Sequence, residues 1–246
     1  MGVTRMLVLF WALWAGGLQA GSVRYQVEGQ TFEGYHLAGA SQQSTLVLLV
    51  HDWDGLTGYE MKRADMLAAL GYRVFAADLF GVGVRPTTVE DKKRLTGALY
   101  LDRASMRALL AGALAEATRL GGKPEKVVAL GYCFGGAAVL ELARSGADLH
   151  GTVSVHGGLE TPPGQNYQQV RGRVLIQHGS ADEAVSLGQF AALIGELERA
   201  GISHEATSYS GAPHAFSVFG SDRYHAEADA LAWQRLVGFL AEISAK

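Results

Sequence analysis

Cysteine, proline and charged residues are all scarce in this chain of 246 residues. A single cysteine cannot form a disulfide bond within the chain, so a small disulfide-stapled fold is excluded. Charged residues make up 18% of the sequence and hydrophobic residues 48%, a balance that excludes intrinsic disorder and allows a large core. The formal net charge of -3 offers no basic surface, so we expect no nucleic-acid partner.

The N-terminal residues have the pattern of a secretory signal peptide. A short positive start precedes the apolar residues 6–15, and small residues then lead to Ala20, a suitable cleavage position. We therefore predict a signal peptide over residues 1–20 and a single domain over residues 21–246, exported to the periplasm or secreted. A retained N-terminal anchor is the alternative, because Leu18 is an imperfect residue three places from the cut.

Short apolar runs alternate with segments of helical spacing along the rest of the chain. Two nearly alternating segments, 23–27 and 31–37, predict an antiparallel hairpin at a sheet edge. The other predicted strands, most of them continuous apolar runs as in a buried parallel sheet, cover residues 45–51, 72–78, 126–130, 151–156, 173–178 and 203–209. The predicted helices cover residues 61–70, 104–120, 137–144, 184–200 and 226–243. This order predicts an α/β fold whose mainly parallel sheet has helices on both faces and binds ligands beyond the carboxyl ends of its strands.

The only cysteine lies in Gly131-Tyr132-Cys133-Phe134-Gly135-Gly136, between a predicted strand and a predicted helix. A Gly-x-Cys-x-Gly sequence at such a turn has the pattern of a nucleophile elbow, with cysteine where serine is commoner. The helix N-terminus beneath Cys133 would favour a thiolate. Export would also leave this thiol in an oxidising compartment with no partner cysteine, and catalysis would explain why it is kept. The alternative is a buried structural cysteine in a glycine-rich turn.

A cysteine nucleophile needs a base and a group that orients the base. Asp182 follows one predicted strand in a His-Gly-Ser-Ala-Asp loop, and His214 follows the last predicted strand in a Pro-His-Ala-Phe loop. The order Cys133, Asp182, His214 is that of α/β-hydrolases, and all three fall on loops at the carboxyl edge of the sheet, so we predict a catalytic triad. Taken singly, Asp182 could instead cap the helix that starts near Ala184, and His214 could serve a surface loop.

Hydrolysis of an ester also needs two N–H donors for the oxygen that becomes negative. Phe134, directly after the nucleophile, supplies one, and we expect Trp53 in the loop of residues 51–55 to supply the other. Phe216 is a further candidate to line an apolar pocket beside the thiol, although core packing explains it equally well.

These motifs together resemble the dienelactone hydrolase family. The resemblance is carried by the Gly-Tyr-Cys-Phe-Gly-Gly elbow, the His-Asp-Trp-Asp-Gly loop, Val-Ser-Val-His-Gly-Gly at residues 153–158, and the loops of Asp182 and His214, and it runs from about Gly29 to Leu240. It implies an α/β-hydrolase fold, a triad of Cys133, Asp182 and His214, and hydrolysis of a lactone or activated ester through a thioester acyl-enzyme.

The resemblance also marks positions where this chain differs from the family. A glutamate that contacts the resting thiol in the family corresponds here to Asp52, which is one methylene shorter. An arginine that holds the substrate carboxylate lies four residues beyond the catalytic histidine, where this chain has Val218, and a second falls near Lys92-Lys93-Arg94. Since a bidentate partner for a carboxylate is missing at Val218, the resemblance supports the chemistry better than the substrate.

We therefore predict a hydrolase of small esters or lactones that needs no cofactor. His51, Asp52, Asp54 and His156 could suggest a metal site, but elbow chemistry needs no metal, so none is predicted. The alternatives are a carboxylesterase or acyltransferase with an unrelated substrate, and a non-catalytic exported protein that binds ligands or senses redox state through its thiol. We expect a monomer without a membrane span once the signal is removed, because no second long hydrophobic run follows.

Overall fold

The computed structural model describes residues 20–38, 45–121 and 124–245. Apart from Ala20, the predicted signal peptide lies outside these described residues. Within the described ranges, none of the helices combines the length and the apolar character that crossing a membrane requires.

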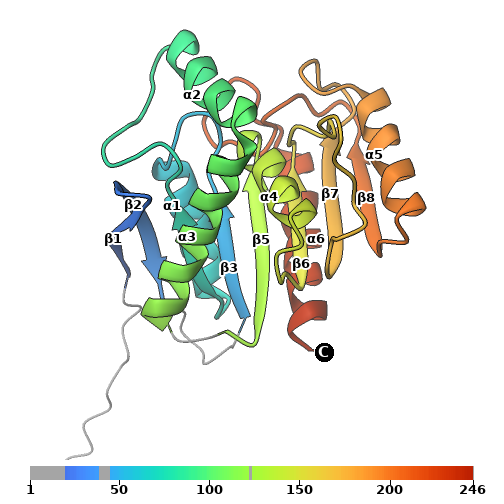
Figure 1. Cartoon of the computed structure of the whole chain (residues 1–246). Coiled ribbons are helices and arrows are strands. Elements are labelled where there is room, and N and C mark those ends of the chain that lie inside the picture. The colour runs from blue at the N-terminus through green and yellow to red at the C-terminus, as the bar shows by residue number, and fades with distance from the viewer. Residues whose placement is uncertain (1–19, 39–44, 122–123, 246) are drawn as a thin grey trace, which may run out of the picture.

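The described residues form an eight-stranded sheet with the strand order β1-β2-β4-β3-β5-β6-β7-β8 (Figure 1). Strand β2 pairs antiparallel with both β1 and β4, whereas every other neighbouring pair is parallel. This confirms the predicted mainly parallel sheet with its N-terminal antiparallel hairpin. The strands are β1 (Ala20–Val27), β2 (Gln30–Leu37), β3 (Thr45–Val50), β4 (Arg73–Ala77), β5 (Lys126–Tyr132), β6 (Gly151–Val155), β7 (Arg173–Gly179) and β8 (His204–Tyr209).

Helices cover both faces of the sheet, as Figure 1 shows. Helices α3, α4 and α5 pack on one face, and α1 and α6 pack on the other. Helix α2 lies against α3. The bounds are α1 (Gly58–Ala69), α2 (Val89–Leu101), α3 (Arg103–Gly121), α4 (Phe134–Arg144), α5 (Leu187–Arg199) and α6 (Ala226–Ser244).

The central strands are apolar throughout because both of their faces are covered. All six residues of β3 are buried. Side chains alternate across a strand, so Leu48 packs in the core under α3 and α4 while its neighbour Leu49 packs in the core under α1 and α6. This two-sided burial explains why the strands appear in the sequence as continuous apolar runs.

The chain order of the strands reverses between β3 and β5. From β3 the chain continues to β4 on one side, whereas β6, β7 and β8 follow β5 on the other side. At such a switch point, the loops that leave the carboxyl ends of neighbouring strands diverge and leave room for a ligand. Asp52 and Trp53 after β3 and Cys133 after β5 line one cavity at this edge of the sheet.

Candidate active site

Cys133 occupies the sharp turn between β5 and α4. Its φ of 51° and ψ of -114° are rare for a residue other than glycine, and such strain is typical of a nucleophile elbow. The turn requires glycine on both sides of it. A Cβ atom on Gly131 would lie 2.0 Å from the carbonyl oxygen of Gly135, and one on Gly135 would lie 2.3 Å from that of Val50. Close approach of strand and helix therefore leaves the Cys133 side chain partly exposed at the cavity.

Cys133, His214 and Asp182 come together at the carboxyl edge of the sheet. Nε2 of His214 lies 3.0 Å from Sγ of Cys133, and Nδ1 of His214 lies 2.8 Å from Oδ2 of Asp182. The three side chains follow β5, β8 and β7, so three separate loops meet here. Because the carboxylate fixes the proton on Nδ1, Nε2 is left to give a proton to the sulfur or to take one from it.

Asp182 uses its two carboxylate oxygens differently. Oδ2 binds His214, while Oδ1 accepts hydrogen bonds from the N–H groups of Ala184 and Val185, both at 2.8 Å. Helix α5 has Ser186 as its N-cap, so Asp182 closes the turn ahead of this helix and does not cap it. Burial alone would raise the pKa of Asp182, but the hydrogen bonds from His214 and the two N–H groups outweigh it and lower that pKa.

The environment of His214 favours the protonated imidazole. Burial on its own lowers the pKa of this side chain, but the hydrogen bonds to Asp182 and Cys133 outweigh burial and raise the pKa to about 10. The ring of His156, 5.6 Å away between centroids, behaves in the opposite way. Burial and the nearby His214 hold the pKa of His156 well below its usual value, so His156 stays neutral.

The N–H groups of Trp53 and Phe134 have no hydrogen-bond acceptor among the described residues. Phe134 is the first residue of α4, where N–H groups have no partner within the helix. Trp53 lies in the turn after β3, and both residues line the cavity beside Cys133. Both N–H groups that the sequence suggested are therefore without an acceptor, and both belong to residues that line the cavity.

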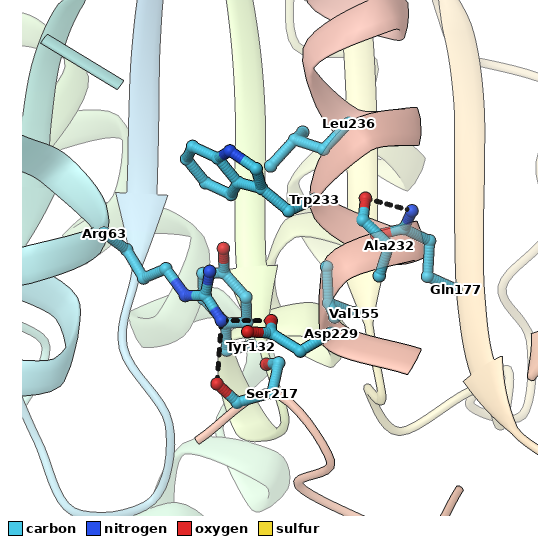
Figure 2. A pocket seen from close by; sticks show the side chains of 9 residues that line it. All are labelled: Arg63, Tyr132, Val155, Gln177, Ser217, Asp229, Ala232, Trp233 and Leu236. Atoms are coloured by element: carbon cyan, nitrogen blue, oxygen red, sulfur yellow. Dashed lines mark hydrogen bonds and ion pairs between the residues drawn. The ribbon is translucent and has the colours of Figure 1, made fainter. Parts of the chain in front are cut away.

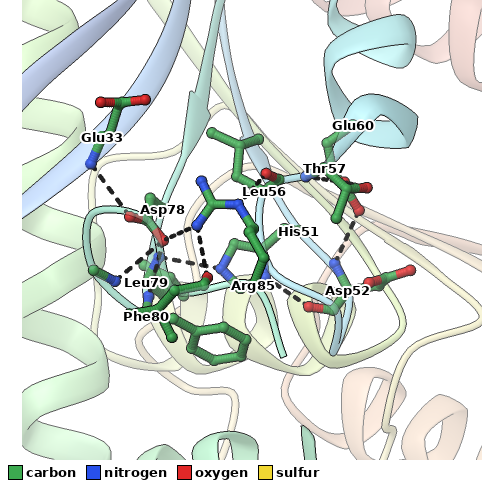
Figure 3. A network of polar contacts seen from close by, with 12 residues as sticks. Glu33, His51, Asp52, Leu56, Thr57, Glu60, Asp78, Leu79, Phe80 and Arg85 are labelled. Carbon is green, nitrogen blue, oxygen red and sulfur yellow. Dashed lines mark hydrogen bonds and ion pairs between the residues drawn. The ribbon is translucent and has the colours of Figure 1, made fainter. Parts of the chain in front are cut away.

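The loop after β3 is held by the network of polar contacts in Figure 3. Glu60, in the first turn of α1, accepts hydrogen bonds from the N–H groups of Thr57 at 2.9 Å and Asp52 at 3.3 Å. Oδ1 of Asp52 accepts the N–H of Asp54 at 2.8 Å. Burial, and then the nearby carboxylate of Glu60, raise the pKa of Asp52. Within the described chain Asp52 makes no hydrogen bond to Cys133, so its carboxyl group serves the loop.

A cavity of about 670 Å³ opens beside Cys133. Its largest apolar side chains come from four elements or loops and are Trp53, Tyr100, Phe134 and Leu159. Phe216 lies elsewhere: it is fully buried, with its ring 5.2 Å from that of His156 and 5.5 Å from that of Tyr209. Of the two roles that the sequence left open for Phe216, its position agrees with core packing.

The basic residues at the cavity are not the ones that the resemblance suggested. Lys92 pairs with Asp54 at 2.6 Å and lies over the ring of Trp53, which holds it against the loop after β3. Val218 is not part of the wall, whereas Arg103 and Arg223 are. Neither arginine belongs to a motif, so their positions at the cavity could be found only from the structure.

His156 joins the turn of Cys133 to the loop of His214, a contact that the sequence did not reveal. Nδ1 of His156 accepts the N–H of Cys133 at 3.2 Å, and Nε2 lies 2.8 Å from Oγ of Ser217. Oγ of Ser217 in turn lies 2.7 Å from the hydroxyl of Tyr59 on α1. The only sequence signal was the position of His156 in a family-like motif, which says nothing about Ser217.

Arg63 of α1 supports the same loop from a buried position (Figure 2). Its Nη2 donates to the carbonyl oxygen of Ser217 at 2.7 Å and to Oδ1 of Asp229 on α6. The side chains of Arg63 and Asp229 are only 1% and 9% exposed. The space lined by these residues has a volume of about 10 Å³, which is too small for a substrate. We therefore assign this cluster to support of the loop.

The four residues considered as a metal site serve other contacts. His51 and His156 each use both ring nitrogens toward protein atoms. Across residues 20–38, 45–121 and 124–245, no group of three or more His, Cys, Asp or Glu side chains is arranged to hold a metal ion.

Known proteins resemble the chain over most of its length. The model of the dienelactone hydrolase family matches residues 32–244. A solved structure named m3DLH is 32% identical with a TM-score of 0.84, covering 93% of this chain and 99% of that one. A dienelactone hydrolase-like promiscuous phosphotriesterase from metagenomic libraries is 29% identical with a TM-score of 0.82 and the same coverage. A protein of Synechocystis sp. that bears a provisional carboxymethylenebutenolidase name is 25% identical over 209 residues, 79% of this chain and 84% of that protein.

Proposed function

Because the chain belongs to the dienelactone hydrolase family, we propose that it hydrolyses small esters or lactones with Cys133 as nucleophile, His214 as acid and base, and Asp182 as the group that orients His214. One observation carries the proposal. His214 lies with Nε2 at 3.0 Å from Sγ of Cys133 and Nδ1 at 2.8 Å from Asp182, and the sulfur faces a cavity large enough for a small ester.

The first half of the reaction forms a thioester. A protonated His214 beside the sulfur favours the thiolate, which attacks the carbonyl carbon of the ester. The carbonyl oxygen becomes negative and accepts hydrogen bonds from the N–H groups of Trp53 and Phe134. The bond to the alkoxy oxygen then breaks, and the leaving alcohol takes the proton from Nε2 of His214.

The second half restores the enzyme. His214 is now neutral and takes a proton from a water molecule, whose oxygen attacks the thioester carbon. The bond between carbon and sulfur breaks, the thiolate returns, and the acid product leaves. Asp182 stays ionised throughout and keeps the proton of Nδ1 in place, which its lowered pKa supports.

The cavity supports a small substrate with an apolar part and a polar part. The four large apolar side chains named above form one part of the wall, whereas Arg103, Glu160 and Arg223 add charged groups to it. Apolar lining with a few placed polar groups is typical of small-molecule sites. The carboxymethylenebutenolidase name of the Synechocystis relative is consistent with a lactone as one substrate class.

Turnover of an activated aryl ester and of small lactones by wild type and Cys133→Ala tests the proposal. We expect the variant to lose about 10⁶-fold in kcat, because removing the nucleophile alone costs about as much as removing the whole triad. Intact-mass measurement after rapid mixing should show an acyl adduct on the wild type and none on the variant. Undiminished turnover by Cys133→Ala would sink the assignment.

A second measurement separates catalysis from the alternative of a thiol-based binding or sensing protein. Iodoacetamide reacts with an accessible thiol in either case, but only a catalyst releases alcohol in a burst followed by steady turnover. We expect His214→Gln to abolish that steady phase. If it leaves turnover unchanged, the non-catalytic alternative stands.

Export and the oligomeric state belong to the same proposal. We propose cleavage after Ala20, so the protein recovered from the periplasm or medium should have a mass that begins at Gly21. A mass that includes residues 1–20 would favour the retained anchor instead. Light scattering of the purified protein should give one chain per particle.

A further inference from the structure

His51 is a buried polar side chain for which the proposed reaction assigns no role. It directly follows β3 and is fully buried. Nδ1 lies 2.6 Å from the carbonyl oxygen of Asp52, and Nε2 lies 3.1 Å from the backbone nitrogen of Leu79 (Figure 3). An N–H group can only donate, so Nε2 is the acceptor from Leu79 and Nδ1 carries the proton. Burial lowers the pKa of His51 to about 4, which keeps this one neutral tautomer at neutral pH.

The bond from His51 acts on the peptide group that carries the N–H of Trp53. The carbonyl of Asp52 and the N–H of Trp53 are the two ends of one planar trans peptide, so they point in opposite directions. Holding the carbonyl oxygen therefore sets the direction of the N–H. A hydrogen bond accepted by the carbonyl also polarises the peptide and makes its N–H a stronger donor.

The N–H groups on either side of Trp53 already have hydrogen-bond acceptors, so only the N–H of Trp53 is available. The N–H of Asp52 is bound by Glu60 and that of Asp54 by Asp52 itself. Gly55 adds only a long contact of 3.4 Å to the carbonyl of Asp52. Among residues 52–54, all within the described chain, the N–H of Trp53 is thus the one without an acceptor, and Trp53 lines the cavity beside Cys133.

We propose that His51 is a positioning residue, which aims the N–H of Trp53 at the ester oxygen through the peptide group between Asp52 and Trp53. The proposal rests on the proposed ester hydrolysis. Packing alone would not require this tautomer: the ring lies 4.6 Å from that of Phe80 and 6.0 Å from that of Phe134, contacts that any flat ring would make. The ordered donor at Nδ1 is what the oxyanion site needs.

Two substitutions separate the donor function from the contact with Leu79. In His51→Asn, the amide nitrogen takes the place of Nδ1 and can donate to the carbonyl of Asp52, while the acceptor for Leu79 is lost. In His51→Gln, the amide oxygen takes the place of Nε2 and can accept from Leu79, while the donor to Asp52 is lost. The two variants thus form a matched pair that differs in which contact survives.

We expect His51→Gln to lower kcat of an activated aryl ester by about 10- to 100-fold, since removing an oxyanion donor outright costs about 10²- to 10³-fold. His51→Asn should stay within about threefold of wild type. Alkylation of Cys133 by iodoacetamide is the control, because attack on a saturated carbon creates no oxyanion. Its rate should be the same in wild type and in both variants.

Equal ester activity of the two variants overturns the proposal. It is also overturned if the alkylation rate of His51→Gln falls as much as its ester activity, because that result would mean that the substitution disorders the whole site. Failure of the proposed ester hydrolysis would be detected by a different measurement on the wild type. If wild type forms no acyl adduct although iodoacetamide labels Cys133, the hydrolysis itself is wrong, and the role of His51 falls with it.

Discussion

The buried ion pair between Arg63 and Asp229 should be among the costliest polar contacts to break. Its two side chains are 1% and 9% exposed, and Arg63 also donates to the carbonyl oxygen of Ser217. The guanidinium lies 4.1 Å from the ring centroid of Phe219 and 5.4 Å from that of Trp233. Asp229→Asn keeps the volume but leaves the guanidinium without its anion, and removing one partner of a buried pair costs about 3–5 kcal/mol.

This cost converts to a large shift in Tm. For a chain of this size, about 1 kcal/mol corresponds to a shift of about 2–4 °C, so we expect Asp229→Asn to lower Tm by about 6–20 °C. Arg63→Met should do the same and should also lower kcat, because Ser217 lies in the loop that carries His214. The double variant Arg63→Met/Asp229→Leu should recover much of the lost stability, since an apolar pair of similar volume leaves no buried charge.

An exposed ion pair supplies the matched control. Arg171 pairs with Asp148 at 3.3 Å, and the two side chains are 64% and 83% exposed. Arg171→Met should change the free energy of unfolding by less than about 1 kcal/mol. Calorimetry at constant pH measures all four variants. If Asp229→Asn costs no more than Arg171→Met, then the desolvation argument for the buried pair is wrong.

Three further predictions concern the loops at the site. Gly131→Ala should unfold or precipitate the protein, because the new Cβ would lie 2.0 Å from a backbone oxygen. The control is Gly97→Ala in the middle of α2, where the new Cβ would meet nothing within 4 Å. This variant should raise the free energy of unfolding by about 0.5–1 kcal/mol in a denaturant titration. The charge of His214 should stabilise the fold fully below its usual pKa of 6.5, and that stability should be lost as the pH rises through its pKa of about 10. The Tm difference between wild type and His214→Gln should therefore shrink from pH 6 to pH 10, and a constant difference would contradict the raised pKa. Ser217→Ala leaves Nε2–H of His156 unsatisfied and should cost about 1–3 kcal/mol by urea unfolding; a change under about 0.5 kcal/mol would mean that the contact is dispensable.

Much of this site could be predicted because its parts are local in sequence. The elbow needs small residues within five positions of Cys133, and the apolar run before it identifies the strand. Asp182 and His214 could be found because parallel strands bring the loops after them to one edge. Each of these features depends on neighbours along the chain or on chain order alone.

The supporting contacts could not be predicted because each depends on partners distant in sequence. His51 binds the N–H of Leu79, 28 residues away, and Arg63 binds Asp229, 166 residues away. In the sequence Arg63 is one charged residue of a helix, and no local pattern distinguishes it from solvated neighbours. Phe216 shows the same limit, since an aromatic residue after a catalytic loop fits either a cavity wall or a core.

The loop of His214 is anchored by α1 through Arg63 and by α6 through Asp229. Helix α6 supplies no residue to the cavity wall, yet the carboxylate that holds Arg63 against the carbonyl of Ser217 belongs to it. A chain cut before Ala226 would keep Cys133, Asp182 and His214 and would still lose this support. The integrity of the proposed site therefore extends to the last helix of the chain.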